Sequence, residues 1–146
     1  MKIFIASDHA GFEQKEQLAA YLIAEGYEVE NLGPENDDRV DYPDFAALLA
    51  RAVAADLKDN RGILVCGTGI GMAIAANKIA GIRAANVTSE AFAVLCREHN
   101  DANVLTLSGR FVDVEENKRA CIAFLTTEFG GGRHAGRVAK ISALEG

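Results

Sequence analysis

Short apolar runs alternate with longer amphipathic segments along this chain, and this alternation limits its possible folds more than any other feature. The run 2–6 ends in a polar turn, and the segment after it places Phe12, Ala19 and Leu22 on one helical face. Five such runs, each followed by a helical pattern, predict an α/β fold: a Rossmann-like three-layer α/β/α sandwich with a five-stranded parallel sheet. The expected strands are 2–6, 27–32, 62–66, 82–87 and 104–107. The expected helices run from Phe12 to before Gly26, from Pro43 to before Asp59, from the glycine-rich loop through Lys78, from Ser89 to about Glu98, and onward from Asp113.

Length and composition indicate one domain that spans residues 1–146. The 146 residues are 49% hydrophobic, which is enough to form a single core of ordinary size. The net charge of -6 argues against binding to nucleic acid or to an anionic membrane, because both attract an excess of Lys and Arg. No run has the form of a signal peptide or the length of a membrane span, so we expect a soluble, cytoplasmic protein.

The cysteines are odd in number and widely spaced, which is typical of a reducing compartment and not of a disulfide framework or a metal site. Cys96 and Cys121 fall among apolar residues of expected helices, and we expect both to be buried core residues. Cys66 differs from them because it stands at the end of a strand and before a helix, where thiolates are stabilised.

The loop CGTGIG, residues 66–71, is the segment most suited to bind a ligand. Its three glycines let the backbone approach a ligand closely, and the helix after it presents free N–H groups to an anion. It lacks the Gly-Lys-Ser/Thr of an ATP-binding loop. Met72 occupies the position of the third glycine in a dinucleotide motif, and also that of the arginine in a cysteine phosphatase. The alternative is a tight turn with Cys66 as a small buried residue.

Two further polar segments contain histidine. Residues 7–9 (SDH) follow the strand at 2–6, and residues 99–103 (HNDAN) precede the strand at 104–107. Because ligands of open parallel sheets bind at the carboxyl ends of the strands, we expect both segments to meet beside the glycine loop. Histidines with adjacent carboxylates and amides suit proton transfer, although each taken alone is equally consistent with an exposed residue or a helix cap.

A basic cluster follows the glycines 130–132 in this acidic chain. Arg133, His134, Arg137 and Lys140 are close together in the sequence and suit a phosphate group, whereas the alternative is an exposed basic tail. A tail that leaves the last long helix through three glycines reaches a neighbouring chain more easily than its own sheet. We therefore expect these arginines to complete a site on a partner subunit.

Taken together, these segments resemble the ribose-5-phosphate isomerase B family, a group that also includes the galactose-6-phosphate isomerase subunits. The resemblance runs from residue 1 to about 140. It is carried by residues 7–12 (SDHAGF), 41–44 (DYPD), 66–72 (CGTGIGM) and 77–78 (NK), by His99 and Asn100 with Asn103, and by Arg133 and Arg137. It implies a homodimer, sometimes paired into tetramers, whose tail at about 130–146 packs on the partner. It also implies interconversion of D-ribose 5-phosphate and D-ribulose 5-phosphate in the pentose phosphate pathway, without metal or organic cofactor.

The same resemblance implies roles for individual residues. Cys66 corresponds to the base that moves a proton between C2 and C1, with Thr68 beside it, although some members use a glutamate from elsewhere. His99 corresponds to the residue that helps to open the sugar ring. The remaining contacts that it implies are Asp8 at the sugar hydroxyls, Tyr42 in the substrate site, Asn100 with the amides of Gly67, Gly69 and Gly71 at the enediolate oxygens, and His9, Arg110, Arg133 and Arg137 at the phosphate.

Two alternatives remain open from the sequence. One is a non-catalytic module that binds a sugar phosphate or a nucleotide, for which the arginines matter and Cys66 does not. The other is an isomerase of another sugar phosphate, such as galactose 6-phosphate or allose 6-phosphate, because the sequence does not determine the length of the pocket.

Overall fold

The structure is a computed structural model that describes residues 1–145. Its centre is a five-stranded sheet with the order β2-β1-β3-β5-β4, in which every pair of neighbours is parallel. The strands are β1 (Lys2–Ser7), β2 (Glu28–Asn31), β3 (Asn60–Cys66), β4 (Ala84–Asn86) and β5 (Val104–Ser108). The helices are α1 (Phe12–Ala24), α2 (Tyr42–Ala54), α3 (Ile70–Ala76), α4 (Glu90–Asn100), α5 (Val114–Thr126) and α6 (Arg133–Ala143).

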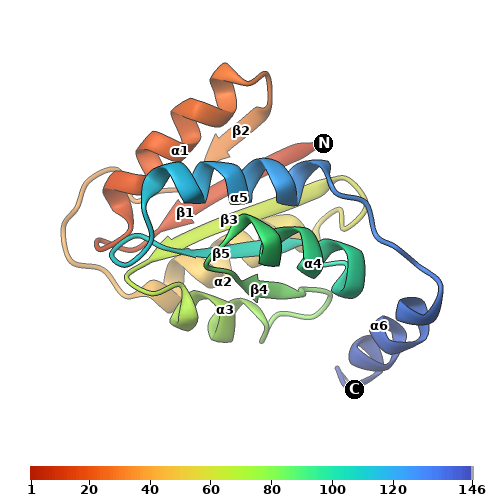
Figure 1. Cartoon of the computed structure of the whole chain (residues 1–146). Coiled ribbons are helices and arrows are strands. Elements are labelled where there is room, and N and C mark those ends of the chain that lie inside the picture. Colours follow the sequence, from red (N-terminus) through yellow and green to blue (C-terminus); the bar gives the residue numbers. More distant parts are fainter. Residues whose placement is uncertain (146) are drawn as a thin grey trace.

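Helices cover both faces of the sheet, so the predicted three-layer α/β/α fold is confirmed (Figure 1). One core lies between the sheet and helices α1, α4 and α5, and includes Ile5, Leu22 and Phe124. The other core lies between the sheet and helices α2 and α3, and includes Leu49 and Met72. Burying a side chain of this size stabilises the fold by about 1.5–3 kcal/mol, and the strands contribute apolar residues to both cores.

The strand β4 is shorter than the expected strand 82–87. Ile82 and Val87, at its two ends, are 4% and 3% exposed but lie outside the ladder of Ala84–Asn86. Val87 N–H still donates to the carbonyl of Thr106 in β5 over 3.1 Å, so the apolar pattern reported the burial of both residues and extended beyond the ladder itself. Because β4 is the last strand in the order across the sheet, only one neighbour, β5, is available to pair with it.

Because neighbouring strands are all parallel, every strand begins at one edge of the sheet and ends at the opposite edge. At the carboxyl edge, where the strands end, the loops after β1, β3 and β5 lie next to one another, on the left in Figure 1. At the amino edge, where the strands begin, lie the ends of α3 and α4 and the helix α6, on the right in Figure 1. A helix that connects two parallel strands returns to the amino edge, so its first residues and its last residues belong to opposite edges.

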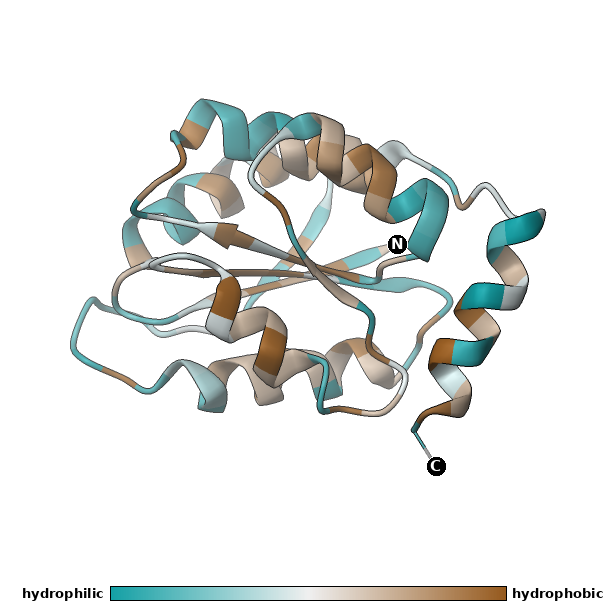
Figure 2. Ribbon diagram, turned by 60° about the horizontal axis from the view of Figure 1, so that its bottom comes forward, coloured by the Kyte–Doolittle hydropathy of each residue, from teal (hydrophilic) through white to brown (hydrophobic). Residues whose placement is uncertain are grey.

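The expected C-terminal tail is in fact the helix α6. It has no buried residue over Arg133–Ala143, although its apolar and polar residues separate to opposite sides as strongly as in any helix of the chain. Figure 2 shows α6 set apart from the three layers. Gly130 N–H donates to the carbonyl of Glu98 over 3.0 Å, and Gly81 N–H donates to Oε1 of Glu145 over 2.7 Å. Within residues 1–145, no helix is long and apolar enough to cross a membrane.

Candidate active site

The glycine loop begins at the end of β3, the central strand of the sheet. Cys66 is 5% exposed, and its Sγ accepts a hydrogen bond from Gly69 N–H over 3.1 Å. Gly69 has a φ of 83° and no room for a Cβ, because a Cβ would collide with the Asn86 side chain and the Leu107 backbone. Only glycine is compatible with this backbone conformation and this space. The loop thus brings a backbone N–H group to the sulfur of Cys66.

The other two cysteines lie in the core, as the sequence predicted. Burial raises the pKa of Cys96 to about 11, an effect that Arg97 partly opposes. Burial alone raises the pKa of Cys121 to about 12. Both side chains are therefore protonated thiols at neutral pH, and neither one accepts a hydrogen bond from a backbone N–H group within residues 1–145.

The loop after β1 packs directly against the glycine loop. Asp8 is 7% exposed, and its Oδ1 accepts a hydrogen bond from Gly11 N–H over 3.0 Å. Gly11 lies so close to the backbone of Val65 that no Cβ fits there. His9 is half-buried, and its Nδ1 lies 3.2 Å from the carbonyl oxygen and 3.3 Å from the nitrogen of Val40. Asp8 and His9 were both predicted from the sequence, whereas Val40 was not, because Val40 contributes through its backbone and a backbone contact leaves no residue signal.

Two more predicted site residues lie on the glycine loop and beside it. Thr68 is exposed, and its Oγ1 accepts a hydrogen bond from Ile70 N–H over 3.1 Å. Tyr42 begins α2 and is 41% exposed, and its ring covers Gly71 so closely that a Cβ there would lie 2.5 Å from Cε1. A side chain at position 71 would therefore displace the Tyr42 ring from its present place.

Arg110 comes from the loop after β5, on the other side of the glycine loop. Its side chain is exposed and covers Gly67, with Nη1 3.4 Å from the position that a Cβ would occupy. Its backbone N–H donates to the carbonyl of Gly67 over 3.2 Å. The predicted residues of β1, β3 and β5 are thus gathered at one edge, on both sides of Cys66.

A buried lysine, which was not predicted from the sequence, holds one of the loops at this edge in place. Lys15 is fully buried, and its Nζ donates to Asn31 Oδ1 over 3.2 Å and to the carbonyl of Pro34. Burial lowers the pKa of Lys15, an effect that Glu16 partly opposes. The ammonium group ties α1 to the loop that leads to Val40 and thus to His9. Lys15 lies in an amphipathic helix where lysines are usually exposed, so the sequence did not predict this buried role.

The expectation that His99 and Asn100 meet the glycine loop within one chain is wrong. Both residues end α4 and lie just before β5, so they belong to the amino edge, whereas Cys66 ends β3 at the carboxyl edge. The prediction placed them by their nearness to a strand in sequence, without regard to which end of that strand they adjoin. Arg133 and Arg137 of α6 lie at the amino edge as well (Figure 1).

At the amino edge, two histidines hold α6 to α4. The rings of His99 and His134 are stacked, with centroids 4.5 Å apart and planes inclined by 18°. Desolvation lowers the pKa of His134, and the nearby His99, Arg133 and Arg137 lower it further, while Glu98 opposes them. Arg133 and Arg137 are exposed, and they take part in none of the ion pairs found in residues 1–145. These two arginines remain free to bind an anion.

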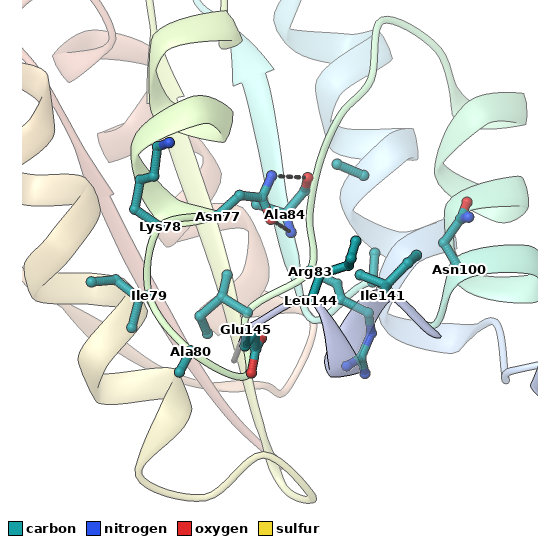
Figure 3. Close-up of a pocket in the computed structure, with 13 residues that line it drawn as sticks. Asn77, Lys78, Ile79, Ala80, Arg83, Ala84, Asn100, Ile141, Leu144 and Glu145 are labelled. Carbon is teal, nitrogen blue, oxygen red and sulfur yellow. Dashed lines mark hydrogen bonds between the residues drawn. The ribbon is translucent and has the colours of Figure 1, made fainter. Parts of the chain in front are cut away.

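A cavity of about 640 Å³ opens between α6 and the loop that joins α3 to β4. Figure 3 shows Asn100, Ile141 and Leu144 among the residues that line it. Asn77 fixes the opposite wall, because its side chain donates to the carbonyl of Ala84 over 2.9 Å and accepts from the N–H of the same residue over 2.8 Å. The amino edge thus has a hollow beside Asn100, although Cys66 is not among its lining residues. Within residues 1–145, no group of three or more His, Cys, Asp or Glu side chains could hold a metal ion.

Comparisons with known proteins identify the family of this chain. A family model described as Ribose/Galactose Isomerase matches residues 3–141. Ribose-5-phosphate isomerase B of Escherichia coli (strain K12) is 45% identical over 144 residues, which are 99% of this chain and 96% of that protein. The structure of ribose-5-phosphate isomerase B from Clostridium thermocellum is similar with a TM-score of 0.96 and 48% identity, over 99% of this chain and 97% of that one. The structure of the Mycoplasma genitalium enzyme with bound ribulose-5-phosphate has a TM-score of 0.96 and 47% identity, over 99% of this chain and 95% of that one.

Proposed function

Because the chain belongs to the ribose/galactose isomerase family, we propose that it interconverts D-ribose 5-phosphate and D-ribulose 5-phosphate, a step of the pentose phosphate pathway. The chain is a sugar-phosphate isomerase, and several of its relatives are ribose-5-phosphate isomerases B, one of them with bound ribulose-5-phosphate. The observation that carries the proposal is Cys66 at the carboxyl edge, with a backbone N–H directed at its sulfur. The proposal extends to the residues that perform the reaction and to the assembly that brings them together.

Cys66 acts as the base in this proposal. The interconversion moves a proton between C2 and C1 of the open-chain sugar through an enediolate, and a thiolate is needed to accept that proton. Gly69 N–H donates to Sγ over 3.1 Å, so a backbone donor is directed at the sulfur atom that takes part in the proton transfer. Cys66 is also the one cysteine that stands at the carboxyl edge, where ligands of parallel sheets bind. Thr68 lies beside it on the same loop.

The glycine loop holds the oxygens of the enediolate. The enediolate is high in energy, so fixed N–H dipoles directed at its oxygens lower the barrier, and losing one such donor costs about 3 kcal/mol. Of the three predicted amides, Gly69 N–H donates to Sγ of Cys66, so the amides of Gly67 and Gly71 are the ones left for the enediolate oxygens. The neighbouring loops fix this loop on both sides. Asp8 has one carboxylate oxygen bonded to Gly11, and its other oxygen is available to sugar hydroxyls. Tyr42 bounds the site on the side of α2.

The phosphate lies away from the reacting carbons and is held by cations. Arg110 and His9 come from the carboxyl edge, while Arg133 and Arg137 come from the amino edge. Binding energy from the remote phosphate positions the sugar for proton transfer at Cys66. Guanidinium groups suit this task because their paired N–H donors match two phosphate oxygens.

The two groups of residues form one site only if two chains combine. Cys66 and His99 lie at opposite edges of one sheet, so no closure within a chain unites them. Exposed apolar side chains flank the edge strand β4: Ile70 and Ile74 on α3, and Phe92 and Leu95 on α4. A two-fold axis beside β4 buries these side chains and reverses the strand direction across the interface. The carboxyl edge of one subunit then meets the amino edge of its partner.

In this homodimer, each site combines Cys66, Asp8 and Arg110 of one subunit with residues of the other. His99 from the partner helps to open the sugar ring, and Asn100 from the partner joins the amides at the enediolate. The helix α6, which buries no residue in its own chain, packs on the partner and supplies its arginines.

A coupled assay on the purified chain tests the activity. The substrates are ribose 5-phosphate, galactose 6-phosphate and allose 6-phosphate at equal concentrations, and the Cys66→Ala variant is the matched control for contaminating isomerase. We expect the highest kcat/KM on ribose 5-phosphate and about 10³-fold lower turnover from the variant. A higher kcat/KM on a six-carbon phosphate would reassign the substrate. Binding of all three without turnover would indicate a non-catalytic sugar-phosphate module.

A further inference from the structure

A serine at the end of β5 bonds directly to the glycine loop. Ser108 is 2% exposed, and its Oγ donates to the carbonyl of Gly67 over 2.7 Å while accepting from Phe111 N–H over 3.0 Å. The hydroxyl therefore has one donor and one acceptor role in use, which fixes the direction of its proton. The carbonyl of Gly67 also accepts from Arg110 N–H over 3.2 Å, so two donors from the loop after β5 hold this oxygen.

The backbone around Ser108 is itself braced from α1 and α5. Asn117, which is 1% exposed, donates through Nδ2 to the carbonyl of Ser108 over 2.9 Å and to Gln14 Oε1 over 2.7 Å. Gln14 in turn donates through Nε2 to the carbonyls of Gly109 over 3.2 Å and Val112 over 2.8 Å. These bonds hold the backbone from Ser108 to Val112, so the Ser108 hydroxyl is a fixed point for the neighbouring glycine loop.

The orientation of the Gly67 carbonyl determines where the next amide points. In a planar trans peptide the C=O and the following N–H point in opposite directions. Because the Gly67 oxygen is bonded to the Ser108 hydroxyl, the N–H of Thr68 points away from Ser108. Within residues 1–145, the N–H of Thr68 donates to no other group. The amide is left available to a ligand oxygen.

We propose that Ser108 is a positioning residue, whose hydroxyl orients the Gly67–Thr68 peptide so that the Thr68 N–H can donate to the enediolate. This inference rests on the proposed isomerisation and adds a residue to it. Ser108 touches no reacting atom, since its hydroxyl is committed to Gly67 and Phe111. Without that hydroxyl, the peptide keeps only the longer bond from Arg110 N–H and rotates more freely.

The chain offers a matched control at the end of the neighbouring strand β1. Ser7 is fully buried like Ser108, but its Oγ has no hydrogen-bond partner in the described part of the chain. Ser108→Ala and Ser7→Ala therefore remove the same atom from equally buried sites at the same edge. Ser108→Cys is the third variant, because it preserves size while replacing a strong O–H donor with a weak S–H donor.

The first readout is steady-state kinetics on ribose 5-phosphate. Loss of an oxyanion donor costs about 10²–10³ in kcat, so a donor that is misdirected part of the time should cost about tenfold. We expect kcat to fall about tenfold in Ser108→Ala and Ser108→Cys, with KM within about twofold because the phosphate contacts are unchanged. Ser7→Ala should retain the kcat of the wild type. Equal kcat in Ser108→Ala and the wild type would overturn the proposal.

The second readout does not depend on turnover. The amide signal of Thr68 in a ¹H–¹⁵N spectrum should broaden in Ser108→Ala and Ser108→Cys, as the peptide samples more than one orientation, and stay sharp in Ser7→Ala. An unchanged Thr68 signal in both Ser108 variants would refute the positioning role. If the wild type does not isomerise ribose 5-phosphate, the proposed function fails while this spectrum still decides the role of Ser108.

Discussion

The two edges of the sheet hold their candidate site residues in different ways. At the carboxyl edge the groups are backbone amides and short side chains, and close contacts at Gly11 and Gly69 fix the loops against one another. At the amino edge the groups are long side chains on helices, and α6 has no buried residue. The carboxyl edge therefore holds its groups in fixed positions, which suits catalysis. The amino edge presents binding groups that a second subunit can share.

The electrostatics of the two edges also differ, because different ends of the helices lie at each edge. Helices α3 and α5 begin at the carboxyl edge, where N–H groups favour anions, and α4 ends at the amino edge, where carbonyls favour cations. Arg83 and Arg97 lie at this end of α4, and each forms an ion pair with the carboxylate of Asp101, at 3.2 and 2.8 Å. Arg133 and Arg137 have no such partner in residues 1–145, which distinguishes arginines that stabilise the fold from arginines that can bind phosphate.

The largest effect expected is at the carboxyl edge. Cys66→Ala should lower kcat by about 10³-fold, near the middle of the range for losing a general base, while the affinity for ribose 5-phosphate stays within a few fold. Single-turnover kinetics and equilibrium binding measure the two quantities separately. Cys96→Ala is the control, because that thiol lies in the core and is protonated at neutral pH. Turnover of Cys66→Ala within a few fold of the wild type would contradict its role as the base.

An intermediate effect tests whether the two edges belong to one site. The double variant Arg133→Ala/Arg137→Ala should bind ribose 5-phosphate about 10²–10⁴-fold more weakly, since each of the two charge-assisted phosphate contacts contributes about 1.5–3 kcal/mol. When its subunits are denatured and remixed equally with Cys66→Ala subunits, about half of the dimers are mixed. Both defects of a mixed dimer fall in one site and leave the other intact, so about a quarter of the wild-type activity should return.

A site built from one chain predicts a different result for the same mixture. Every site would then carry one of the two defects, and remixing would restore nothing. The control is to remix each variant with itself, which measures the recovery of refolded subunits. No activity in the mixture above these controls would refute the shared site, even if each variant alone behaves as expected.

The smallest effect is a pH dependence of the amino edge. The pKa of His134 is lowered in the folded chain by desolvation, then by His99 and the two arginines. A histidine with a lowered pKa stabilises the folded state above its ordinary value near 6.5, and that stability is lost as the pH falls through the folded-state pKa. We expect the amides of α6 to exchange with solvent faster at acid pH, after correction for intrinsic rates.

His134→Phe provides the matched comparison for this pH effect. The phenyl ring can still stack on His99, but it takes up no proton at the position of His134. Exchange of the α6 amides should therefore depend less on pH in this variant, while the amides of β3 should be unaffected in both proteins. A pH dependence of equal size in the variant would show that His134 is not the group responsible.

The local chemistry of this protein was determined by its sequence. The alternation of apolar runs and amphipathic segments predicted the three layers, and the CGTGIG loop at 66–71 predicted a ligand-binding turn after a buried strand. Cys96 and Cys121 were placed in the core by their apolar neighbours. These features depend on residues near one another in the chain, and their physical causes, burial and glycine conformation, are visible in a short window of sequence.

Only the tertiary structure decided which residues face one another. The periodicity at 82–87 reported burial but not the short pairing of β4 with β5, and the tail after Gly132 gave no sign of forming α6. His99 was expected beside Cys66, but β3 and β5 are parallel, so a residue that precedes β5 lies at the opposite edge from one that ends β3. The order of the strands arises from packing between segments that are distant in the chain. A pattern within a short window of sequence therefore does not predict it.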